Sequence, residues 1–337
     1  MVSVGRVGPL GAERVLVVGA GSLVSVYGGY LARAGLPVQL YTRSAHARAI
    51  EAAGGLPVIA DDEQFLAPVR ATDRPDEVEE ADLVIVLCKA PDTAQALDEL
   101  SHLVGAPKVA VSLQNGIDEH GVLAAWAGPD VVVGGVSMVG ATRAEPGVVQ
   151  HTLTTPTFLG ELSGTTSDRV RHLGELLDGA GLPVEVTDRI RSVEWSKTVH
   201  ASPAMALTAL TRHWFHEDFL APELASLFLD LVLEGAEVAL AEGVEVDDWP
   251  SLLRLRTLTQ LPYDQALDLI DGHGHKLVSA GATRVQISML QSVERGRWTE
   301  VEALHGVLAR AAVRHGIAAP ATRICYRLLA GLDRYST

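Results

Sequence analysis

The chain has 337 residues, of which 47% are apolar, and its formal net charge at pH 7 is −15. That length suits two domains with a core each, and the negative charge argues against nucleic acid or an anionic membrane as a partner. Cys88 and Cys325 stand far apart, which predicts free thiols and a cytoplasmic setting, and we expect neither a signal peptide nor a membrane span.

Residues 1–13 are expected to form a leader, and residues 14–188 an α/β domain with a parallel sheet. In the latter region short apolar runs alternate with helical stretches, the pattern of parallel strands joined by crossover helices. The runs consist mostly of Val, Leu and Ile, as in strands covered on both faces. The expected strands are Val15–Val18, Val38–Tyr41, Leu83–Leu87, Val109–Leu113 and Val131–Val136. A turn-rich stretch over Gly147–Gly164 suggests a further antiparallel hairpin.

The pattern changes after Asp188, where strand-like runs give way to long amphipathic segments. We therefore expect residues 189–337 to form an all-helical domain. Pro222 suits the first turn of a helix that runs towards Gly243, because the N–H that proline lacks is unpaired there anyway. Thr299-Glu-Val-Glu302 has the spacing of a capping box, in which the two end residues cap each other's backbone, at the start of a helix that stops near Gly316.

A glycine-rich turn, Gly19-Ala-Gly21, follows the first expected strand and precedes a helix. Backbone N–H groups at the start of such a helix can hold a pyrophosphate. Gly19 would permit the turn, and Gly21 would permit the close approach of the phosphates. Val24 replaces the third glycine of the usual fingerprint, so we expect it to hold the helix away from the strand. The candidate dinucleotide-binding residues here are Gly19, Gly21, Ser22 and Leu23.

Arg43 follows the second expected strand, where enzymes that use NAD place an acidic residue for the ribose hydroxyls. An arginine at this point can pair with the 2′-phosphate of NADP instead. The sequence therefore predicts NADP(H) as the cofactor. The alternative is a solvated arginine that binds no ligand.

Further motifs follow in the order Leu87-Cys-Lys-Ala90, Gln114-Asn-Gly116, Gly140-Ala-Thr-Arg143, Glu194-Trp-Ser-Lys197 and Ser288-Met-Leu-Gln291 with Thr299-Glu300. Together with the glycine-rich turn they resemble the ketopantoate (2-dehydropantoate) reductase family over about residues 14–330. The resemblance implies a Rossmann-type domain, a helical C-terminal domain like that of 6-phosphogluconate dehydrogenase, and a cleft between them. It also implies hydride transfer from NADPH to the carbonyl of a 2-oxo acid or related ketone. The oligomeric state is left open, with a homodimer as one alternative.

Carried over position by position, the resemblance assigns roles to five polar residues. Lys197 would polarise the carbonyl and supply the proton, as a lysine in a desolvated site can. Glu300 would bind substrate or orient Lys197, and Ser288 would bind the substrate carboxylate. Lys89 would face the cofactor and the substrate anion, and Asn115 would lie near the nicotinamide ribose and the substrate. On the residues alone, the lysines could be solvated, Asn115 could belong to a simple turn, and the other two could serve helix capping or packing.

Two positions depart from the family pattern. Ala201 and Met205 stand where the family usually has pocket asparagines, so the substrate pocket should be less polar and ketopantoate should not be the best substrate. His200 lies near Lys197 on the same expected helix. It is a candidate for a replacement substrate contact, with packing in the helical domain as the alternative.

No metal site is expected. Asp271-Gly-His273-Gly-His275 has suitable residue types but no distant partner, so we interpret it as a solvated turn. The main hypothesis is an NADPH-dependent reductase of a small-molecule 2-oxo acid or ketone. The alternative is a member of the same family that performs non-redox chemistry or only binds a nucleotide, which Val24 and the missing asparagines would permit.

Overall fold

The computed structural model describes residues 13–19, 21–60, 63–249 and 253–334, which form two compact units. The sheet unit contains the residues up to Gln114 together with Glu119–Ile190. The helical unit contains Asn115–Asp118 together with the residues from Arg191 onward. Of the leader expected at residues 1–13, all but Glu13 lies outside the described residues.

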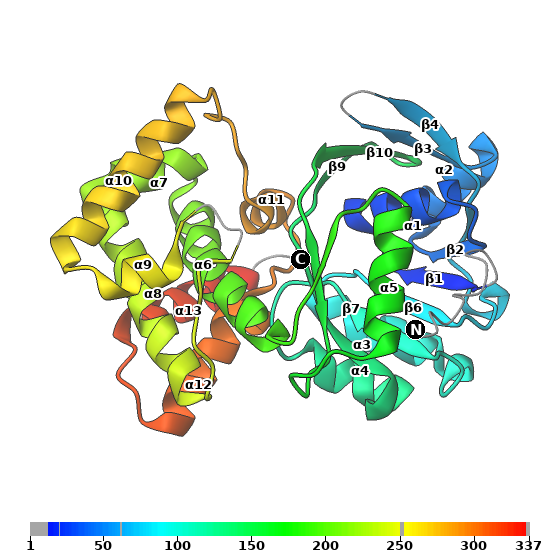
Figure 1. The fold of residues 1–337 in the computed structure, drawn as a ribbon. Coiled ribbons are helices and arrows are strands. Elements are labelled where there is room, and N and C mark those ends of the chain that lie inside the picture. Colours follow the sequence, from blue (N-terminus) through cyan, green and yellow to red (C-terminus); the bar gives the residue numbers. More distant parts are fainter. Residues whose placement is uncertain (1–12, 20, 61–62, 250–252, 335–337) are drawn as a thin grey trace, which may run out of the picture. The chain divides into compact units, whose positions relative to one another are not determined.

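The main sheet of the sheet unit has the strand order of a doubly wound α/β domain (Figure 1). Its strands in spatial order are β12 (Val184–Val186), β11 (Thr157–Gly160), β8 (Val132–Ser137), β7 (Val109–Ser112), β6 (Leu83–Val86), β1 (Val15–Val18), β2 (Val38–Tyr41) and β5 (Arg70–Thr72). Neighbouring strands run parallel, except that β11 is antiparallel to β8. The expected Rossmann-type sheet is confirmed, and its strand order reverses between β1 and β6, where such sheets bind ligands.

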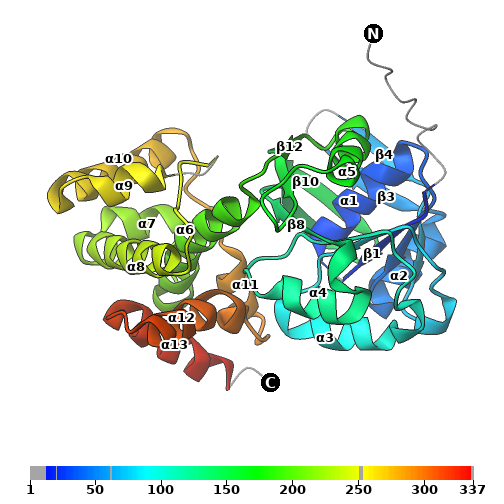
Figure 2. The same ribbon diagram turned by 60° about the horizontal axis from the view of Figure 1, so that its bottom comes forward.

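Helices cover both faces of the main sheet. They are α1 (Ser22–Arg33) and α5 (Asp168–Gly179) on one face, and α3 (Ala90–Glu99) and α4 (Glu119–Ala127) on the other, with α2 (Ser44–Ala53) beside β5 (Figures 1 and 2). Successive residues of a strand point to opposite faces. Accordingly Val15 and Val17 of β1 belong to the core under α1, whereas Leu16 and Val18 belong to the core under α3. Short 3₁₀ turns occupy Pro75–Glu77, Ser101–Leu103 and Pro129–Val131.

Helix α1 also packs against a smaller sheet. The strand order of that sheet is β4 (Gln64–Ala67), β3 (Leu56–Ile59), β10 (Val148–Leu153) and β9 (Gly140–Glu145). Two adjacent glycines of α1 let the helix pack closely against both sheets. A Cβ at Gly28 would lie 2.4 Å from the Leu40 side chain of β2 in the main sheet, and one at Gly29 would lie 2.8 Å from Val58 of β3 in the smaller sheet. The expected effect of Val24 is therefore wrong. Val24 is fully buried in the core, and α1 approaches the strands closely one turn later.

The hairpin expected within Gly147–Gly164 is wrong in its extent. Strands β9 and β10 form an antiparallel hairpin that begins at Gly140, ahead of that stretch. Strand β11 leaves the hairpin and pairs with β8 in the main sheet. All four residues of β11 are buried in the main sheet, whereas β10 has several exposed residues. Burial of the apolar pair Phe158-Leu159 therefore accounts for the pairing of β11 with the main sheet.

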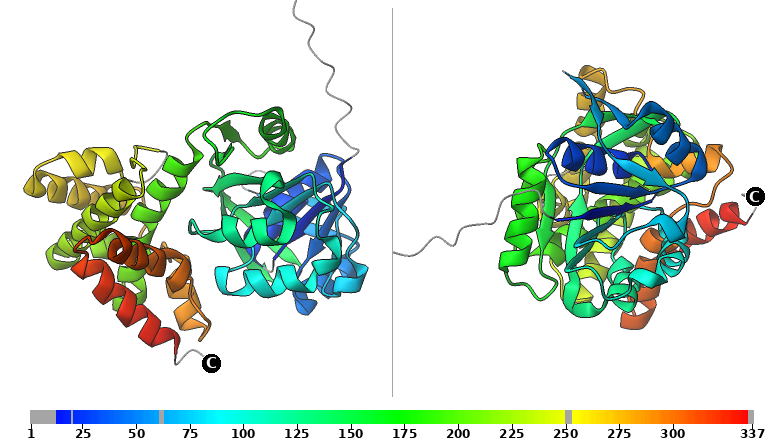
Figure 3. Two further views of the ribbon diagram at one scale, coloured as in Figure 1. Left: turned by 90° about the horizontal axis from the view of Figure 1, so that it is seen from below. Right: turned by 90° about the vertical axis from the view of Figure 1, so that its right-hand side faces the viewer.

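The second unit is helical, as expected. Its helices are α6 (Ile190–Thr211), α7 (Phe215–Leu220), α8 (Pro222–Ala241), α9 (Leu255–Gln260), α10 (Tyr263–Ser279), α11 (Ser288–Glu294), α12 (Val307–His315) and α13 (Pro320–Asp333), with a π-helical turn over Glu302–Gly306. Pro222 occupies the first turn of α8, and α12 ends at Gly316 in the left-handed conformation. Figures 2 and 3 show α12 and α13 side by side, and both contact α8. No helix among the described residues is long and apolar enough to cross a membrane.

The interpretation of Asp271–His275 as a solvated turn is wrong, because these residues lie within α10. Gly274 lets α10 approach α7, since a Cβ there would lie 2.9 Å from the Leu220 side chain. The His273 ring packs against Phe219 with 5.6 Å between ring centroids. Within the described ranges, no group of His, Cys, Asp and Glu side chains is arranged to hold a metal ion.

Candidate active site

The glycine-rich turn between β1 and α1 requires a glycine at its first position. Gly19 has a φ of +141°, and a Cβ there would lie 2.6 Å from the Cys88 backbone nitrogen. Gly21 is the N-cap of α1 with an extended backbone, and a Cβ there would meet its nearest neighbour at 3.8 Å. Gly19 thus allows the close packing of this turn against the chain at Cys88, and the approach of the phosphates at Gly21 stays a prediction. Since Gly21 has no side chain to cap the helix, the N–H groups of Ser22 and Leu23 are available to an anionic ligand.

An open pocket of about 450 Å³ lies next to this turn, at the carboxyl ends of β1, β2 and β6. Its lining residues are Gly19, Tyr41, Thr42, Arg43, Ser44, Asp73, Cys88, Asp92, Gln95, Ala96 and Glu99. Arg43 is the N-cap residue of α2. Its guanidinium group forms an ion pair with the Asp92 carboxylate, with 2.8 Å between Nη2 and Oδ2. The structure thus places Arg43 in the pocket beside the glycine-rich turn, together with a carboxylate partner.

Sequence reasoning did not identify the pocket's three acidic residues, Asp73, Asp92 and Glu99. The hydroxyl of Tyr41 donates a hydrogen bond to Glu99, and Ser44 donates one to Asp73. Burial together with the charge of Glu99 raises the pKa of Tyr41 well above its usual range. These carboxylates come from loops and helices far from Arg43 in sequence, so only the order of the strands could have suggested that they meet.

Gln114 joins the ends of β6 and β7 beside this pocket. Its Nε2 donates to the Cys88 carbonyl oxygen and to Thr93 Oγ1, both at 2.7 Å. Lys89 follows Cys88 as the N-cap residue of α3, and its carbonyl oxygen accepts a 2.8 Å hydrogen bond from the Asp92 N–H. Lys89 is therefore fixed at the carboxyl end of β6, in the sheet unit, as the sequence indicated.

The helical unit brings three candidate residues together. Lys197 lies on α6, Glu300 precedes the π-helical turn, and Asn115 Nδ2 lies 3.5 Å from Glu300 Oε2. Burial lowers the pKa of Lys197 to about 8, and the nearby charge of Glu300 opposes this shift. A lysine with this pKa is charged at neutral pH but gives up its proton readily, which suits a general acid. The arrangement can therefore deliver a proton to an oxygen atom held beside Lys197.

The two parts of the chain match two known domains in the same order. Residues 15–164 match the family described as Ketopantoate reductase PanE/ApbA, and residues 189–333 match its C-terminal domain. The chain belongs to the ketopantoate reductase family. This confirms the resemblance drawn from the short motifs.

Individual members of the ketopantoate reductase family align over nearly the whole chain. A 2-dehydropantoate 2-reductase of Halobacterium salinarum is 32% identical and covers 92% of this chain and 95% of its own. The crystal structure of a family member from Ralstonia eutropha JMP134 has a TM-score of 0.80 at 27% identity, over 96% of this chain and 99% of that one. D-mandelate dehydrogenase, solved with NADH and anilino(oxo)acetate, shares the fold with a TM-score of 0.82 at 20% identity, over 96% and 99% of the two chains.

In this member of the ketopantoate reductase family, Glu300 is positioned by its neighbours in the chain. The N–H of Thr299 donates to both oxygens of the Asp333 carboxylate, at 3.1 and 3.2 Å, and its hydroxyl donates to Oδ2 at 2.9 Å. Asp333, on α13, is only 4% exposed. The capping box expected with Glu302 is therefore wrong, because Asp333 takes the Thr299 N–H and Glu302 pairs with Arg310 instead.

Two further contacts hold the segment after Glu300. His305 lies in the π-helical turn, and its Nε2 donates a 2.8 Å hydrogen bond to the Ser202 carbonyl oxygen of α6. Gly116, at a φ of +102°, lies so close to the segment that a Cβ would be 2.7 Å from the Ala303 oxygen. These contacts fix the segment of Glu300 against α6 and Asn115. π-Helical turns are frequent at functional sites.

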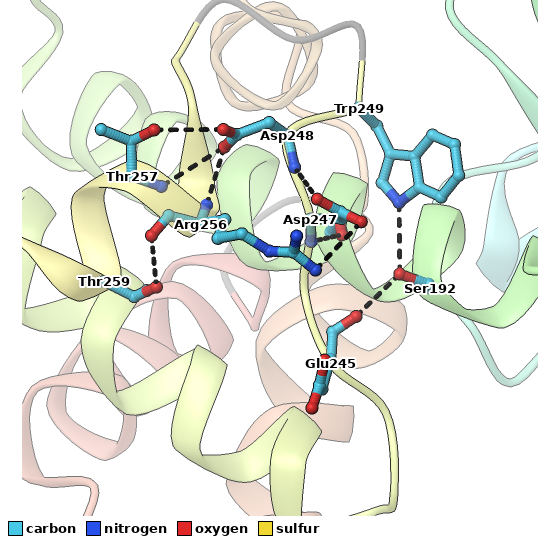
Figure 4. Close-up of polar contacts among 9 residues, drawn as sticks. Ser192, Glu245, Asp247, Asp248, Trp249, Arg256, Thr257 and Thr259 are labelled. Carbon is cyan, nitrogen blue, oxygen red and sulfur yellow. Dashed lines mark hydrogen bonds and ion pairs between the residues drawn. The ribbon is translucent and has the colours of Figure 1, made fainter.

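Residues 245–249, in the loop after α8, form hydrogen bonds with the first turns of α6, which precede Lys197 (Figure 4). Ser192 donates a 2.7 Å hydrogen bond to the Glu245 carbonyl oxygen and accepts one from Trp249 Nε1 at 3.2 Å. Ser196 accepts a hydrogen bond from the Asp247 N–H at 2.9 Å. Residues 192 and 196 are one helical turn apart, so the loop binds one face of α6 directly before Lys197. Sequence reasoning did not identify this support.

The remaining candidates differ in their surroundings. Ser288 is at the start of α11, and its buried Oγ has no hydrogen-bond partner among the described residues. Such an atom can bind a ligand without breaking an existing contact. Met205 is buried in an apolar cluster with Met289, next to Ser288, and with Val301, next to Glu300; Ala201 packs against the same cluster.

His200 lies in the core of the helical unit. Its ring packs against Phe228 with 6.3 Å between centroids, and burial, with a smaller effect of His273, lowers its pKa to about 4. A neutral imidazole among aromatic side chains stabilises helix packing. The ring therefore contributes to packing, but its Nε2 is buried without a hydrogen-bond partner among the described residues, as Ser288 Oγ is, so the substrate contact stays a prediction.

Proposed function

We propose that this protein is an NADPH-dependent reductase of 2-oxo acids in which Lys197 is the proton donor. The observation that carries the proposal is the grouping of Lys197, Glu300 and Asn115, with burial holding the pKa of Lys197 near 8. The family is one of oxidoreductases whose named members, such as the relative from Halobacterium salinarum, are 2-dehydropantoate 2-reductases.

The residues of the sheet unit fit a dinucleotide. Gly19, at a positive φ, lets the chain turn sharply between β1 and α1, and the uncapped N–H groups of Ser22 and Leu23 can donate to a phosphate. Arg43 can pair with a 2′-phosphate. When bound, NADPH supplies the hydride. Lys89, at the carboxyl end of β6, would then lie near the cofactor and the substrate anion, as the family resemblance implies.

The helical unit supplies the acid chemistry. Lys197 donates a proton to the carbonyl oxygen as negative charge develops there. Glu300 favours the charged form of Lys197, and Asn115 lies within reach of Glu300, where it can contact the substrate. Ser288 Oγ, which is buried without a partner among the described residues, donates to the substrate carboxylate.

The expected substrates are 2-oxo acids with an apolar substituent. Ala201 and Met205 provide no amide groups, and the apolar cluster to which they belong includes the direct neighbours of Ser288 and Glu300. The D-mandelate dehydrogenase of the same fold was solved with anilino(oxo)acetate, a 2-oxo acid with an aromatic substituent. This agrees with a pocket that prefers apolar volume to a hydroxyl group.

The proposal is tested by following NADPH oxidation at about 340 nm with ketopantoate, aliphatic 2-oxo acids and aryl 2-oxo acids. Lys197→Ala should reduce turnover by about 10²–10⁴-fold and leave NADPH binding nearly unchanged. Lys276→Ala, on the exposed side of α10, is the matched control and should have normal turnover. NADPH binding without turnover of any 2-oxo acid or ketone would favour the alternative of a nucleotide-binding or non-redox protein.

A further inference from the structure

The pocket beside the glycine-rich turn contains one guanidinium group and three carboxylates. Asp73 accepts a hydrogen bond from Ser44, and Glu99 accepts one from Tyr41. Asp92 is the carboxylate that holds Arg43, at 2.8 Å. The cation that would bind a 2′-phosphate is therefore already paired within the pocket.

Asp92 is fixed in place by the start of α3. Its N–H donates a 2.8 Å hydrogen bond to the Lys89 carbonyl oxygen, and it lies in the first turn of the helix. Carboxylates are favoured at this point because the N-terminal end of a helix carries partial positive charge. Arg43 is the N-cap residue of α2, so the paired side chains come from the N-terminal ends of two different helices and both line the pocket.

We propose that Asp92 sets the cofactor preference of this protein by competing with the 2′-phosphate of NADPH for Arg43, which makes the pocket accept NADH as well. This inference rests on the proposed function. NADH has a 2′-hydroxyl in place of the phosphate, and a carboxylate can accept a hydrogen bond from a ribose hydroxyl. Asp92 thus supplies, from α3, the acidic group that enzymes using NAD place after the second strand.

The net charge of the pocket lining also disfavours the 2′-phosphate of NADPH. Three carboxylates against one guanidinium group leave the lining negative, so a further phosphate is repelled unless Arg43 is released to meet it. The side chains of Arg43 and Asp92 are 59% and 50% exposed, which places their ion pair in contact with water. An exposed ion pair is weak, so the 2′-phosphate can displace Asp92 from Arg43. The binding free energy gained from Arg43 is then reduced by the loss of that ion pair.

The inference is tested by titrating the purified full-length protein with NADPH and with NADH and following the fluorescence of the bound cofactor. The Asp92→Asn variant should bind NADPH about two- to fivefold more tightly, the range expected when an exposed ion pair no longer competes. It should bind NADH no better than the unmodified protein. Asp98→Asn is the matched control, because Asp98 is exposed on the same helix, outside the pocket lining, and its change removes the same charge.

A double variant separates competition for Arg43 from simple repulsion. If Asp92 acts through Arg43, then Asp92→Asn should give little or no gain in NADPH affinity when Arg43 is already alanine. An equal gain in both backgrounds, or an equal gain from Asp98→Asn, would overturn the inference. Binding of neither dinucleotide by the unmodified protein would refute the proposed function itself. Tight NADPH binding with an unchanged NADPH-to-NADH ratio in Asp92→Asn would refute only this inference.

Discussion

The acid chemistry proposed for Lys197 makes a definite prediction about pH. Lysine has an ordinary pKa of 10.5, which burial lowers to about 8 in this protein, while the charge of Glu300 acts to raise it. Since a proton donor must be protonated, kcat/KM should fall as the pH rises through about 8. Glu300→Gln removes the opposing charge and leaves the burial, so the midpoint of this fall should move below 8.

The size of the shift follows from the usual effect of a nearby opposite charge, which is about one pKa unit or more. At pH 8, a shift of one unit would reduce the protonated fraction of Lys197 from about one half to about one tenth. Glutamine is almost the same size as glutamate and can still accept a hydrogen bond from Asn115. The variant therefore tests the charge of Glu300 and not its volume.

The assay is kcat/KM for the best 2-oxo acid, measured with saturating NADPH from about pH 6 to about pH 10. Glu302→Gln is the control, because Glu302 lies two residues away, carries the same charge, and pairs with Arg310 at the surface. Its pH midpoint should stay where it is in the unmodified protein. A role for the Glu300 charge is refuted if Glu300→Gln leaves the midpoint unchanged or raises it, or if Glu302→Gln lowers it equally.

Three further outcomes can be measured. Arg43→Ala should weaken NADPH binding. Because Arg43 is exposed, the loss of binding free energy should be near the low end of about 1–3 kcal/mol, as measured by calorimetric titration. Val24→Gly should lower the free energy of unfolding by about 3 kcal/mol, since Val24 is fully buried, and should not tighten NADPH binding. Tighter NADPH binding by this variant would instead indicate that Val24 holds α1 away from the strand. Ketopantoate should have a lower kcat/KM than apolar 2-oxo acids because Ala201 and Met205 lack amide groups, and a clear preference for ketopantoate would contradict this.

Features that depend on neighbouring residues were predictable from the sequence. The runs of Val, Leu and Ile indicated both ends of each expected strand to within one residue, because strands buried on both faces require such residues continuously. Pro222 and Gly316 marked helix ends because their backbone preferences act locally. The motifs around Lys197 and Glu300 likewise lie in short segments, so they were visible without the fold.

Features that depend on distant residues were not predictable in this way. Thr299 had a local candidate partner in Glu302, yet it binds Asp333, which lies far along the chain and is buried beside it. The space that α1 needs is provided by Gly28 and not by the position of Val24, because the angle between helix and strand decides which residue faces Leu40. In each case the sequence contains the residue types, but the pairing depends on how the helices and strands pack.

The same packing explains how the helical unit tolerates a buried lysine. A fall in the Lys197 pKa from 10.5 to about 8 corresponds to about 3 kcal/mol against the charged form, so the unit is less stable at neutral pH than it would be with an apolar side chain there. Hydrogen bonds of the segments that carry Lys197 and Glu300 contribute stability against this cost. Ser196 ties the preceding turn of α6 to the Asp247 N–H, and Asp333 holds the segment that carries Glu300. These contacts hold both segments in place, and the desolvation that lowers stability is the property that brings the pKa of Lys197 into the range useful for catalysis.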